Sequence, residues 1–380
     1  MYLQRVEVRD FRNYARAGRD FSAGVVVLHG PNGAGKTNLL EAVCVAARGD
    51  SPRARTTEEL VRQGSEHGFV RGEFGGMERA ARVEVGLART GQRQVKVNGV
   101  VRRRVDLIGV APVVYFSAED IGVVRGEPAA RRRLLDRGLC SVSAPYFSDL
   151  VRYRRAVAQR NRLLKDLREQ GGGGGEGLAA WDRAVARYGA RVMVARQEFI
   201  AALAPEVVRA HGTVTGAEAP LAVEYRPSIA VPSEQSAGGA GKGRAEIVEE
   251  ICEVLTRALE ERRAADVSCG ATGWGPHRDD LELLLGGQPV RVYGSQGEQR
   301  SSAVGVRLGL AAVMRQMTGE RPLLLLDDVL SELDARHRAG VFAACEGSEQ
   351  VIMTCCDEED IPAEVRARAT VLAIRQGQVS

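Results

Sequence analysis

The sequence lacks several features that mark common classes of protein. Its seven cysteines are an odd number without a CxxC pair, so they indicate neither a disulfide framework nor a zinc site and fit a reducing cytosol. They are Cys44, Cys140, Cys252, Cys269, Cys345, Cys355 and Cys356. The start, MYLQRVEVRDFRNY, has no continuous apolar stretch such as a signal peptide needs, and no apolar run is long enough for a membrane span. We therefore expect a cytoplasmic protein without a membrane partner.

Lysine is also scarce, because only four of the 53 basic residues are lysines. The net charge of +4 is too small to indicate an anionic partner by itself, but residues 125–165 hold eleven basic and three acidic residues, a local charge of +8. The five histidines show no metal-ligand spacing, so no metal beyond Mg²⁺ is expected. A chain of 380 residues exceeds the size at which one core stops growing, which predicts two lobes or a large insertion.

Apolar patterning predicts an α/β lobe at each end of the chain. YLQRVEVRDF alternates as a half-buried strand does, GVVVLHG is a β-branched run, and KTNLLEAVCVAA then predicts a helix. Asn98 and Gly99 predict a type I′ hairpin. Near the C-terminus we expect a hairpin in LELLLGGQPVRVY, a helix in SSAVGVRLGLAAVMRQM, and strands in PLLLLDDV, QVIMT and TVLAIRQGQV.

The middle of the chain predicts helices. Apolar residues recur at four- and three-residue steps from Tyr146 to Leu167, with Arg160 as the one polar member, and again from Leu178 to Phe199. The glycine turn at 171–177 between them favours an antiparallel pair that forms a short coiled-coil arm. The alternative is two core helices of an ordinary bundle. A loop at 233–244, expected to be disordered, precedes one more helix.

A glycine-rich loop lies between the second predicted strand and the helix that follows it. It consists of Gly30, Pro31, Asn32, Gly33, Ala34, Gly35, Lys36 and Thr37, and it matches the Walker A motif GxxxxGK[ST]. Its backbone N–H groups and the helix N-terminus suit the phosphates of ATP. Lys36 is expected to reach the β- and γ-phosphates, and the Thr37 hydroxyl to ligate Mg²⁺. The alternative is a glycine-rich turn that binds no ligand.

Two acidic residues end the apolar strand PLLLLDD, where a parallel sheet presents its ligand edge. The stretch resembles a Walker B motif, in which Asp327 would hold Mg²⁺ through water and Asp328 would orient the attacking water as general base. Lys36 and Asp327 lie 291 residues apart, so a large segment must be inserted between the two motifs.

A third motif, GSQGEQR, begins at Gly294 directly before a predicted helix. By itself it is compatible with a simple helix cap, because Ser295 is a good N-cap residue. In its order after Walker A and before Walker B, it resembles the signature of ABC-type ATPases of the SMC branch, at Ser295, Gln296, Gly297 and Glu298. The resemblance implies that this signature contacts the γ-phosphate held by the glycine loop of a second subunit, and that SELD, from Ser331 to Asp334, is the D-loop at the dimer seam.

Stretches over nearly the whole chain resemble the RecF family. They are LQRVEVRDFRNY, GPNGAGKTNLLEAV, FSAEDIGVVRGEPAARRRLLD, TGWGPHRDDLEL and LLLLDDVLSELD. The resemblance implies an ATP-dependent homodimer that binds double-stranded and gapped DNA in recombinational repair and replication-fork maintenance, with RecR and RecO as partners in recombinase loading. It also implies an ABC-type P-loop ATPase head formed from residues 1–120 and 265–380, with a helical arm domain inserted at 121–264.

The chain departs from the ABC pattern in three places. No glutamine lies between Phe116 and Asp120, where these proteins have their Q-loop, and Thr354 and Cys355 replace the switch histidine after QVIM. Asp328 stands where most members have glutamate, and its shorter side chain must bring water within reach by other means. We expect slow hydrolysis of ATP, which suits a switch better than a motor.

The basic stretch offers candidate contacts to DNA phosphates. They are Arg131, Arg132, Arg133, Arg152, Arg154 and Arg155. The alternative is a solvated helix face, because runs of charge alone are unspecific. A second stretch, HRDD at His277 to Asp280, resembles a kinase catalytic loop, but no other kinase motif accompanies it and a turn is expected.

Three functions compete: an ATP-switched DNA-binding dimer, an ABC-type nucleotide-binding subunit with a non-DNA partner such as a transporter, and a P-loop kinase or transferase. A transporter subunit needs a short region between the motifs and a Q-loop, and a kinase needs no signature. The sequence therefore favours the first.

Overall fold

The computed structural model describes residues 1–76, 80–170, 177–216, 219–230, 243–356, 361–375 and 378–379. The chain divides into two units. Unit 1 contains Met1–Arg125, Leu203–Ala222 and Leu284–Ser380, and unit 2 contains Gly126–Ala202 and Val223–Leu283. Unit 1 thus contains both ends of the chain, and unit 2 comes from its middle. The boundaries differ, because the arm runs to Leu283 rather than to 264, and Leu203–Ala222 lies in unit 1.

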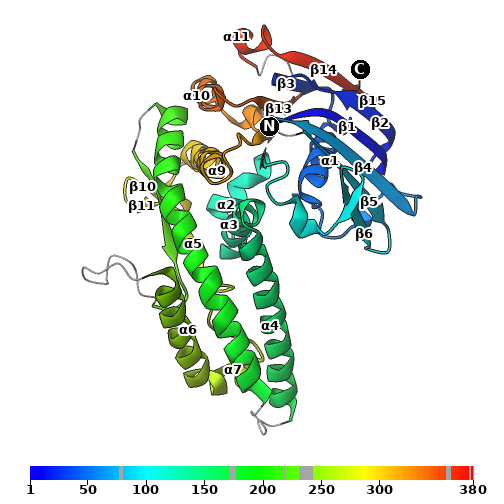
Figure 1. The fold of residues 1–380 in the computed structure, drawn as a ribbon. Coiled ribbons are helices and arrows are strands. Elements are labelled where there is room, and N and C mark those ends of the chain that lie inside the picture. The colour runs from blue at the N-terminus through cyan, green and yellow to red at the C-terminus, as the bar shows by residue number, and fades with distance from the viewer. Residues whose placement is uncertain are drawn as a thin grey trace. The chain divides into compact units, whose positions relative to one another are not determined.

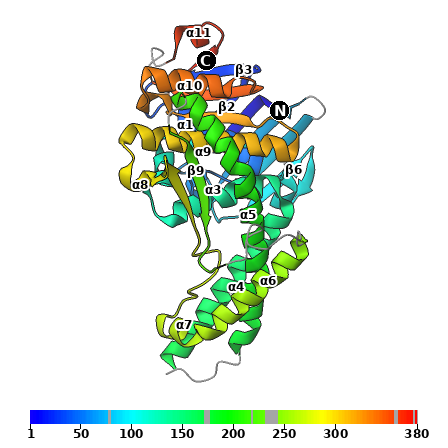
Figure 2. The ribbon, with the colours of Figure 1, turned by 90° about the vertical axis from the view of Figure 1, so that its left-hand side faces the viewer.

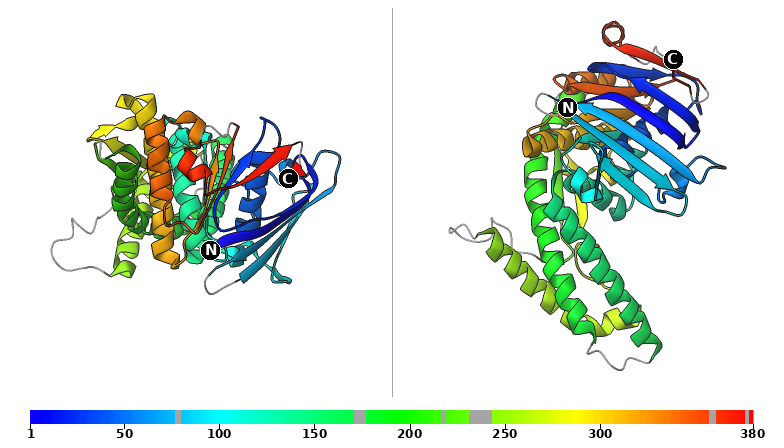
Figure 3. Two further views of the ribbon diagram at one scale, coloured as in Figure 1. Left: turned by 90° about the horizontal axis from the view of Figure 1, so that it is seen from above. Right: turned by 45° about the vertical axis from the view of Figure 1, so that its right-hand side comes forward.

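One sheet of unit 1 is antiparallel. In spatial order its strands are β2 (Tyr14–Asp20), β1 (Tyr2–Phe11), β4 (His67–Gly75), β5 (Ala80–Ala88), β6 (Arg93–Val97) and β7 (Val100–Arg102). The hairpin between β6 and β7 is confirmed, with φ angles of 50° at Asn98 and 81° at Gly99, as a type I′ turn requires. Figure 3 looks onto the outer face of this sheet, which no described helix covers and which carries ion pairs such as Arg71 with Glu84.

The second sheet of unit 1 joins strands from both ends of the chain. In spatial order they are β15 (Gln378–Val379), β14 (Thr370–Arg375), β3 (Gly24–His29), β13 (Gln350–Cys355), β12 (Leu323–Asp327) and β8 (Val113–Ser117). All except β15 run parallel, so their carboxyl ends meet at one edge (Figure 1). At that edge Asp327 lies opposite Ser117 on one side and Thr354 on the other.

Helix α1 (Lys36–Arg48) packs between the two sheets. Every residue from Leu39 to Ala47 is buried. A helix that is buried on all sides needs a layer on each side, and its core cluster indeed contains side chains of both sheets. Arg12, in the turn between β1 and β2, donates two hydrogen bonds of 2.8 Å to the buried carboxylate of Glu41 and so holds the helix against that turn.

The other described helices of unit 1 come from both ends of the chain. They are α2 (Ile121–Arg125), α8 (Val290–Tyr293), α9 (Gln296–Thr318), α10 (Ala335–Cys345) and α11 (Ala363–Arg366), with the 3₁₀ helices η1 (Glu58–Leu60), η2 (Arg104–Leu107), η3 (Ala118–Asp120) and η5 (Leu330–Glu332). The last turns of α5 (Leu178–Thr215) pack closely on α9 and α10. A Cβ on Gly309 would lie 2.7 Å from Val207, and one on Gly340 would lie 2.3 Å from the Val214 oxygen. This contact explains why Leu203–Ala222 lies in unit 1.

A small sheet contains β11 (Gln288–Pro289), β10 (Asp280–Leu285) and β9 (Leu221–Arg226). Strands β10 and β11 are the hairpin predicted in LELLLGGQPVRVY, but its last four residues form the helical turn α8 instead.

Unit 2 is helical. Its helices are α3 (Pro128–Val142), α4 (Ala144–Glu169), the first part of α5, α6 (Arg244–Glu261) and α7 (Arg263–Cys269). Figures 1 and 2 show α6 and α7 beside α4 and α5, so the inserted helical arm is confirmed and contains more than the predicted pair of helices. Leu164 and Leu167 of α4 pack with Leu178 of α5 and Val267 of α7, as expected of a small bundle. The apolar series from Tyr146 to Leu167 is buried as predicted.

Arg160, the polar member of that series, is fully buried. Its guanidinium donates hydrogen bonds to Asp182 on α5 at 2.6 Å and to Asp266 on α7 at 2.7 Å. A buried charge needs such partners. At the one polar position of the apolar series, these ion pairs therefore connect α4 with α5 and α7.

Two predicted segments, the glycine turn and the loop at 233–244, lie largely outside the described residues. Of the helices that the structure describes, none combines the length and apolar character of a membrane span.

Candidate nucleotide-binding site

The glycine loop leaves β3 and enters α1 by a path that only glycine permits. Gly30, Gly33 and Gly35 have φ angles of 153°, 78° and 116°. Two of them also have close neighbours, since a Cβ on Gly30 would lie 2.2 Å from the Ile374 oxygen and one on Gly35 would lie 2.8 Å from the Tyr14 hydroxyl. The motif glycines are therefore needed for two reasons. They allow the backbone path of the loop, and they leave room for its close contacts with β14 and with the start of β2.

Lys36 is held inside the loop. Its side chain is buried, and its ammonium donates hydrogen bonds to the backbone oxygens of Gly30 and Pro31, the latter at 3.1 Å. The Cys356 sulfur lies 3.5 Å from the same nitrogen. The positive charge thus lies against carbonyl oxygens of the same loop that would bind a phosphate.

One hydrogen bond joins the two Walker motifs. The Thr37 hydroxyl donates to Asp327 Oδ1 at 2.8 Å, although the two residues are 290 positions apart. Thr354 donates to the same oxygen at 2.9 Å, and Tyr115 donates to Oδ2 at 2.7 Å. Burial and the Asp327 carboxylate raise the pKa of Tyr115 well above its usual range, so the phenol stays a donor at neutral pH. An oriented carboxylate beside a hydroxyl is a set of hard oxygen ligands that suits Mg²⁺.

Asp328 is one of four residues other than glycine with a positive φ among those that the structure describes. Its φ of 54° lies in the left-handed region, and its backbone N–H donates to the Thr354 hydroxyl at 2.9 Å. Such backbone conformations are uncommon outside glycine and occur often at functional sites.

A cavity of about 300 Å³ opens over the loop. Its lining residues are Asn32, Gly33, Ala34, Gly35, Lys36, Thr37, Asn38, Arg53, Asp328, Thr354 and Cys356. The structure therefore brings the predicted loop and Asp328 to one cavity. Sequence reasoning missed Arg53, a second cation there, whose guanidinium donates to Asn38 at 3.4 Å. No local pattern marks it, because the chain returns to the cavity after the end of α1.

The two residues at the switch-histidine position, Thr354 and Cys355, have different surroundings. Cys355 is buried and does not line the cavity, whereas Cys356 does, and its thiol donates to the Asn32 side-chain oxygen at 2.9 Å. Thr354 contacts Asp327 on the same side. In an extended chain alternate residues point to the same face. Thr354 and Cys356 are two positions apart, so the sequence already indicated that these two, rather than Cys355, could face the same cavity.

The signature stretch begins α9 with a reciprocal cap. Glu298 N–H donates to the Ser295 hydroxyl at 3.3 Å, and Ser295 N–H donates to the Glu298 carboxylate at 2.7 Å. These bonds with Ser295 lower the pKa of Glu298, so its carboxylate is ionised at neutral pH. A Cβ on Gly297 would meet nothing within 4 Å. The cap thus holds the motif in shape while leaving open space at Gly297.

The D-loop stretch is tied to the Walker B end. The Ser331 hydroxyl donates to the Asp328 backbone oxygen at 3.1 Å. Asp334 caps α10 by accepting a 2.9 Å bond from the His337 N–H.

The six arginines assigned to DNA have different surroundings. Arg131 is buried and donates bonds of 2.7 and 2.9 Å to the two carboxylate oxygens of Asp280. Arg132 is half-buried, donates to the Asp279 backbone oxygen, and has its pKa lowered by burial. We remove these two from the candidate DNA contacts, because a guanidinium held inside the fold by a protein oxygen does not meet phosphate.

The other four arginines are exposed: Arg133, Arg152, Arg154 and Arg155. Arg154 also donates to Asp136 at 2.9 Å, and the Arg152 guanidinium lies 5.8 Å from the centre of the Tyr188 ring.

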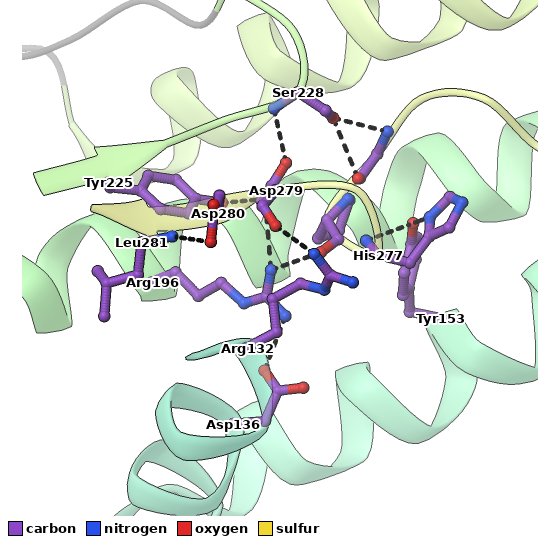
Figure 4. A network of polar contacts seen from close by, with 12 residues as sticks. Arg132, Asp136, Tyr153, Arg196, Tyr225, Ser228, His277, Asp279, Asp280 and Leu281 are labelled. Carbon is purple, nitrogen blue, oxygen red and sulfur yellow. Dashed lines mark hydrogen bonds and ion pairs between the residues drawn. The ribbon is translucent and has the colours of Figure 1, made fainter. Parts of the chain in front are cut away.

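The HRDD stretch forms the turn expected before β10, and it also organises unit 2. Figure 4 shows Asp279 among the side chains of Arg196 and Tyr225, which both donate to its carboxylate, while Ser228 N–H donates at 2.8 Å. Arg196 continues to Asp136 at 2.8 Å. A buried charge without a partner is costly, and this network supplies partners for Asp279 and Arg196. The HRDD stretch thus has a structural role, and no kinase-like role is needed to explain it.

A Walker A loop and a Walker B carboxylate at one edge of a parallel sheet, with a capped signature in the same unit, define the head of an ABC-type ATPase. A family model described as "RecF/RecN/SMC N terminal domain" matches residues 2–378. The chain belongs to the RecF family of DNA replication and repair proteins.

Individual relatives support the same family assignment. The chain is 38% identical over 365 residues to a RecF protein of Acidothermus cellulolyticus, covering 95% of this chain and 96% of the relative. It is 35% identical to the RecF of a Synechocystis species over 100% and 98% of the two chains. Among solved structures, "the recombination mediator protein RecF-ATP in RecFOR pathway" matches with a TM-score of 0.87 and 31% identity over 100% and 97% of the two chains. An Smc head matches in fold, with a TM-score of 0.53, 13% identity, and coverage of 100% and 96%.

Proposed function

We propose that this chain binds ATP with Mg²⁺ at the glycine-loop cavity and uses the nucleotide to join two copies into a dimer that holds DNA. The hydrogen bond between Thr37 and Asp327 carries the proposal, because it unites the two halves of a Mg·ATP site from opposite ends of the chain. The solved relative named with ATP supports the choice of nucleotide.

Each residue of the cavity has a proposed task. The loop N–H groups and Lys36 would bind the phosphates, and Thr37 and Asp327 would hold Mg²⁺, which would supply charge neutralisation at the phosphate oxygens. Asp328 orients water and accepts its proton as hydrolysis begins. Its short side chain keeps the expected rate low, so ATP acts chiefly as a switch.

The dimer is proposed to form across the signature. Ser295, Gln296, Gly297 and Glu298 of one copy would meet the nucleotide of the other, with Ser331 and Asp334 at the seam. The open space at Gly297 supports this role, since a phosphate can approach the helix start there.

The DNA contact is proposed at Arg133, Arg152, Arg154 and Arg155, and the ligand is double-stranded DNA beside a gap. Relatives named for the RecFOR pathway suggest RecO and RecR as partners in loading a recombinase. Two arms in one dimer double the phosphate contacts, so ATP should tighten DNA binding without touching DNA.

A mobility assay with a gapped duplex tests this proposal, with and without Mg·ATP and at several salt concentrations. The variant with Arg152, Arg154 and Arg155 changed to alanine should flatten the dependence of log affinity on log salt by roughly 0.9 per lost contact. The matched control changes Arg183, Arg187 and Arg257, which are exposed on α5 and α6, and so removes the same charge outside the basic stretch. Equal slopes for both variants would move the DNA site elsewhere, and no effect of ATP on the parent would refute the switch.

A further inference from the structure

The segment after β8 starts beside the Walker B acid. Ser117, the last residue of β8, lies opposite Asp327 in the parallel register, and η3 and α2 follow directly. The general ABC pattern, described above, has a glutamine in this segment, and none stands here. A different group must therefore connect the nucleotide edge to the signature helix.

Asp120 occupies that place. Its Oδ2 accepts a 2.9 Å bond from Ser117 N–H, which closes the turn after β8. The same carboxylate receives both Nε, at 3.0 Å, and Nη2 of Arg307 on α9. The side chains of Asp120 and Arg307 are only 15% and 12% exposed, so solvent screens this two-pronged pair less than a surface pair.

A second contact reaches the start of the signature. Arg125, at the end of α2, donates to the Gln299 side-chain oxygen. The Gln299 amide in turn donates to the backbone oxygens of Val290, at 3.3 Å, and Gly294, at 2.8 Å. Since Gly294 directly precedes Ser295, this chain of bonds holds the turn that enters the signature.

Apolar packing between the same elements is incomplete. A cavity of about 280 Å³ is lined by residues of β8, η3, α2 and α9 and by Val329 and Leu333 at the D-loop. Across such a cavity the side chains of facing elements do not interdigitate. A small shift of one element is then only weakly transmitted to the other by van der Waals contact. The polar contacts of Asp120 and Arg125 bridge the elements around this cavity.

We propose that Asp120 and Arg307 are positioning residues that transmit the nucleotide state of the sheet edge to the signature, in place of the missing glutamine. The inference rests on the proposed function, because its effect is expressed when ATP joins two copies. Arg307 touches no nucleotide in this scheme and acts through α9.

The test compares Asp120→Asn, Arg307→Met and the exchanged pair Asp120→Arg with Arg307→Asp. The single variants should bind Mg·ATP as monomers like the parent but need at least about fivefold more ATP for half-maximal dimerisation by light scattering, the lower end of typical allosteric coupling. The exchanged pair restores the opposite charges and should recover part of the loss, which a purely additive loss of stability would not do.

Glu84→Gln is the matched control, because Glu84 forms a similar pair with Arg71, with side chains 15% and 22% exposed, on the outer sheet face. It should change the melting temperature comparably while leaving dimerisation unchanged. If the parent dimerises with ATP and the Asp120 and Arg307 variants need no more ATP than Glu84→Gln, the inference is wrong. If the parent itself does not respond to ATP, the proposed function has failed instead.

Discussion

Replacing Tyr115 by phenylalanine tests how the proposed Mg²⁺ carboxylate is oriented. The change deletes one oxygen and with it the 2.7 Å bond to Asp327 Oδ2. Hydrogen bonds to charged groups contribute about 1.5–3 kcal/mol, and lost partners of metal ligands lower metal affinity roughly 10- to 100-fold. Thr37 and Thr354 still hold the other oxygen. We therefore expect the lower end of that range, about 10-fold.

The assay is calorimetric binding of ATP with Mg²⁺ and with EDTA. The gain in affinity from Mg²⁺ should shrink in Tyr115→Phe, while binding in EDTA stays near that of the parent. Because the pKa of Tyr115 is raised, its proton remains bound as the pH increases from 7 to 9, so the parent should keep its full Mg²⁺ gain over that interval.

Tyr14→Phe provides the matched control. It also deletes a buried phenol oxygen next to the glycine loop, but that hydroxyl donates to the Gly35 backbone oxygen at 2.9 Å rather than to Asp327. Its effect on ATP affinity should be the same with Mg²⁺ and with EDTA. An unchanged Mg²⁺ gain in Tyr115→Phe would refute the argument that the phenol orients the carboxylate.

Three further predictions follow from the same unit. Asp328→Asn should slow phosphate release at least about 10²-fold, typical for loss of a general base, while ATP binding persists; parental turnover would assign the base elsewhere. Mg·ATP should slow alkylation of Cys356 by iodoacetamide, measured by mass spectrometry, while the exposed Cys269 reacts at the same rate; equal slowing of both, or of neither, contradicts the cavity assignment. Gly309→Ala should lower the free energy of unfolding by about 1–3 kcal/mol in urea titrations, because its Cβ would lie 2.7 Å from Val207; parental stability would show that α5 moves aside freely.

The Walker A loop could be predicted because its chemistry lies in eight consecutive residues. The glycines set the backbone path, and Lys36 and Thr37 follow at the helix start. The hairpin at Asn98 and Gly99 was predictable for the same reason, since positive φ angles are a local preference. The signature needed more, because a helix cap and a phosphate contact share the same residues, and only its order among the other motifs favoured the second.

The arginines show where local reasoning ended. Arg131 and Arg133 are two positions apart in one basic run, yet Arg131 is buried against Asp280, 149 residues later, and Arg133 is exposed. In the sequence both residues are simply positive charges of the same basic stretch. Which of them can meet DNA depends on the carboxylates that folding brings to each.

Sequence alone thus determined the family and the fold class, and it predicted the nucleotide chemistry. Tertiary structure decided which charges remain exposed and which cysteine, Cys356 rather than Cys355, lines the cavity. It also decided that Asp120 pairs with Arg307. The physical reason is that dihedral preferences and apolar periodicity act over a few residues, whereas a charge is satisfied by whichever partner the fold brings within hydrogen-bond distance.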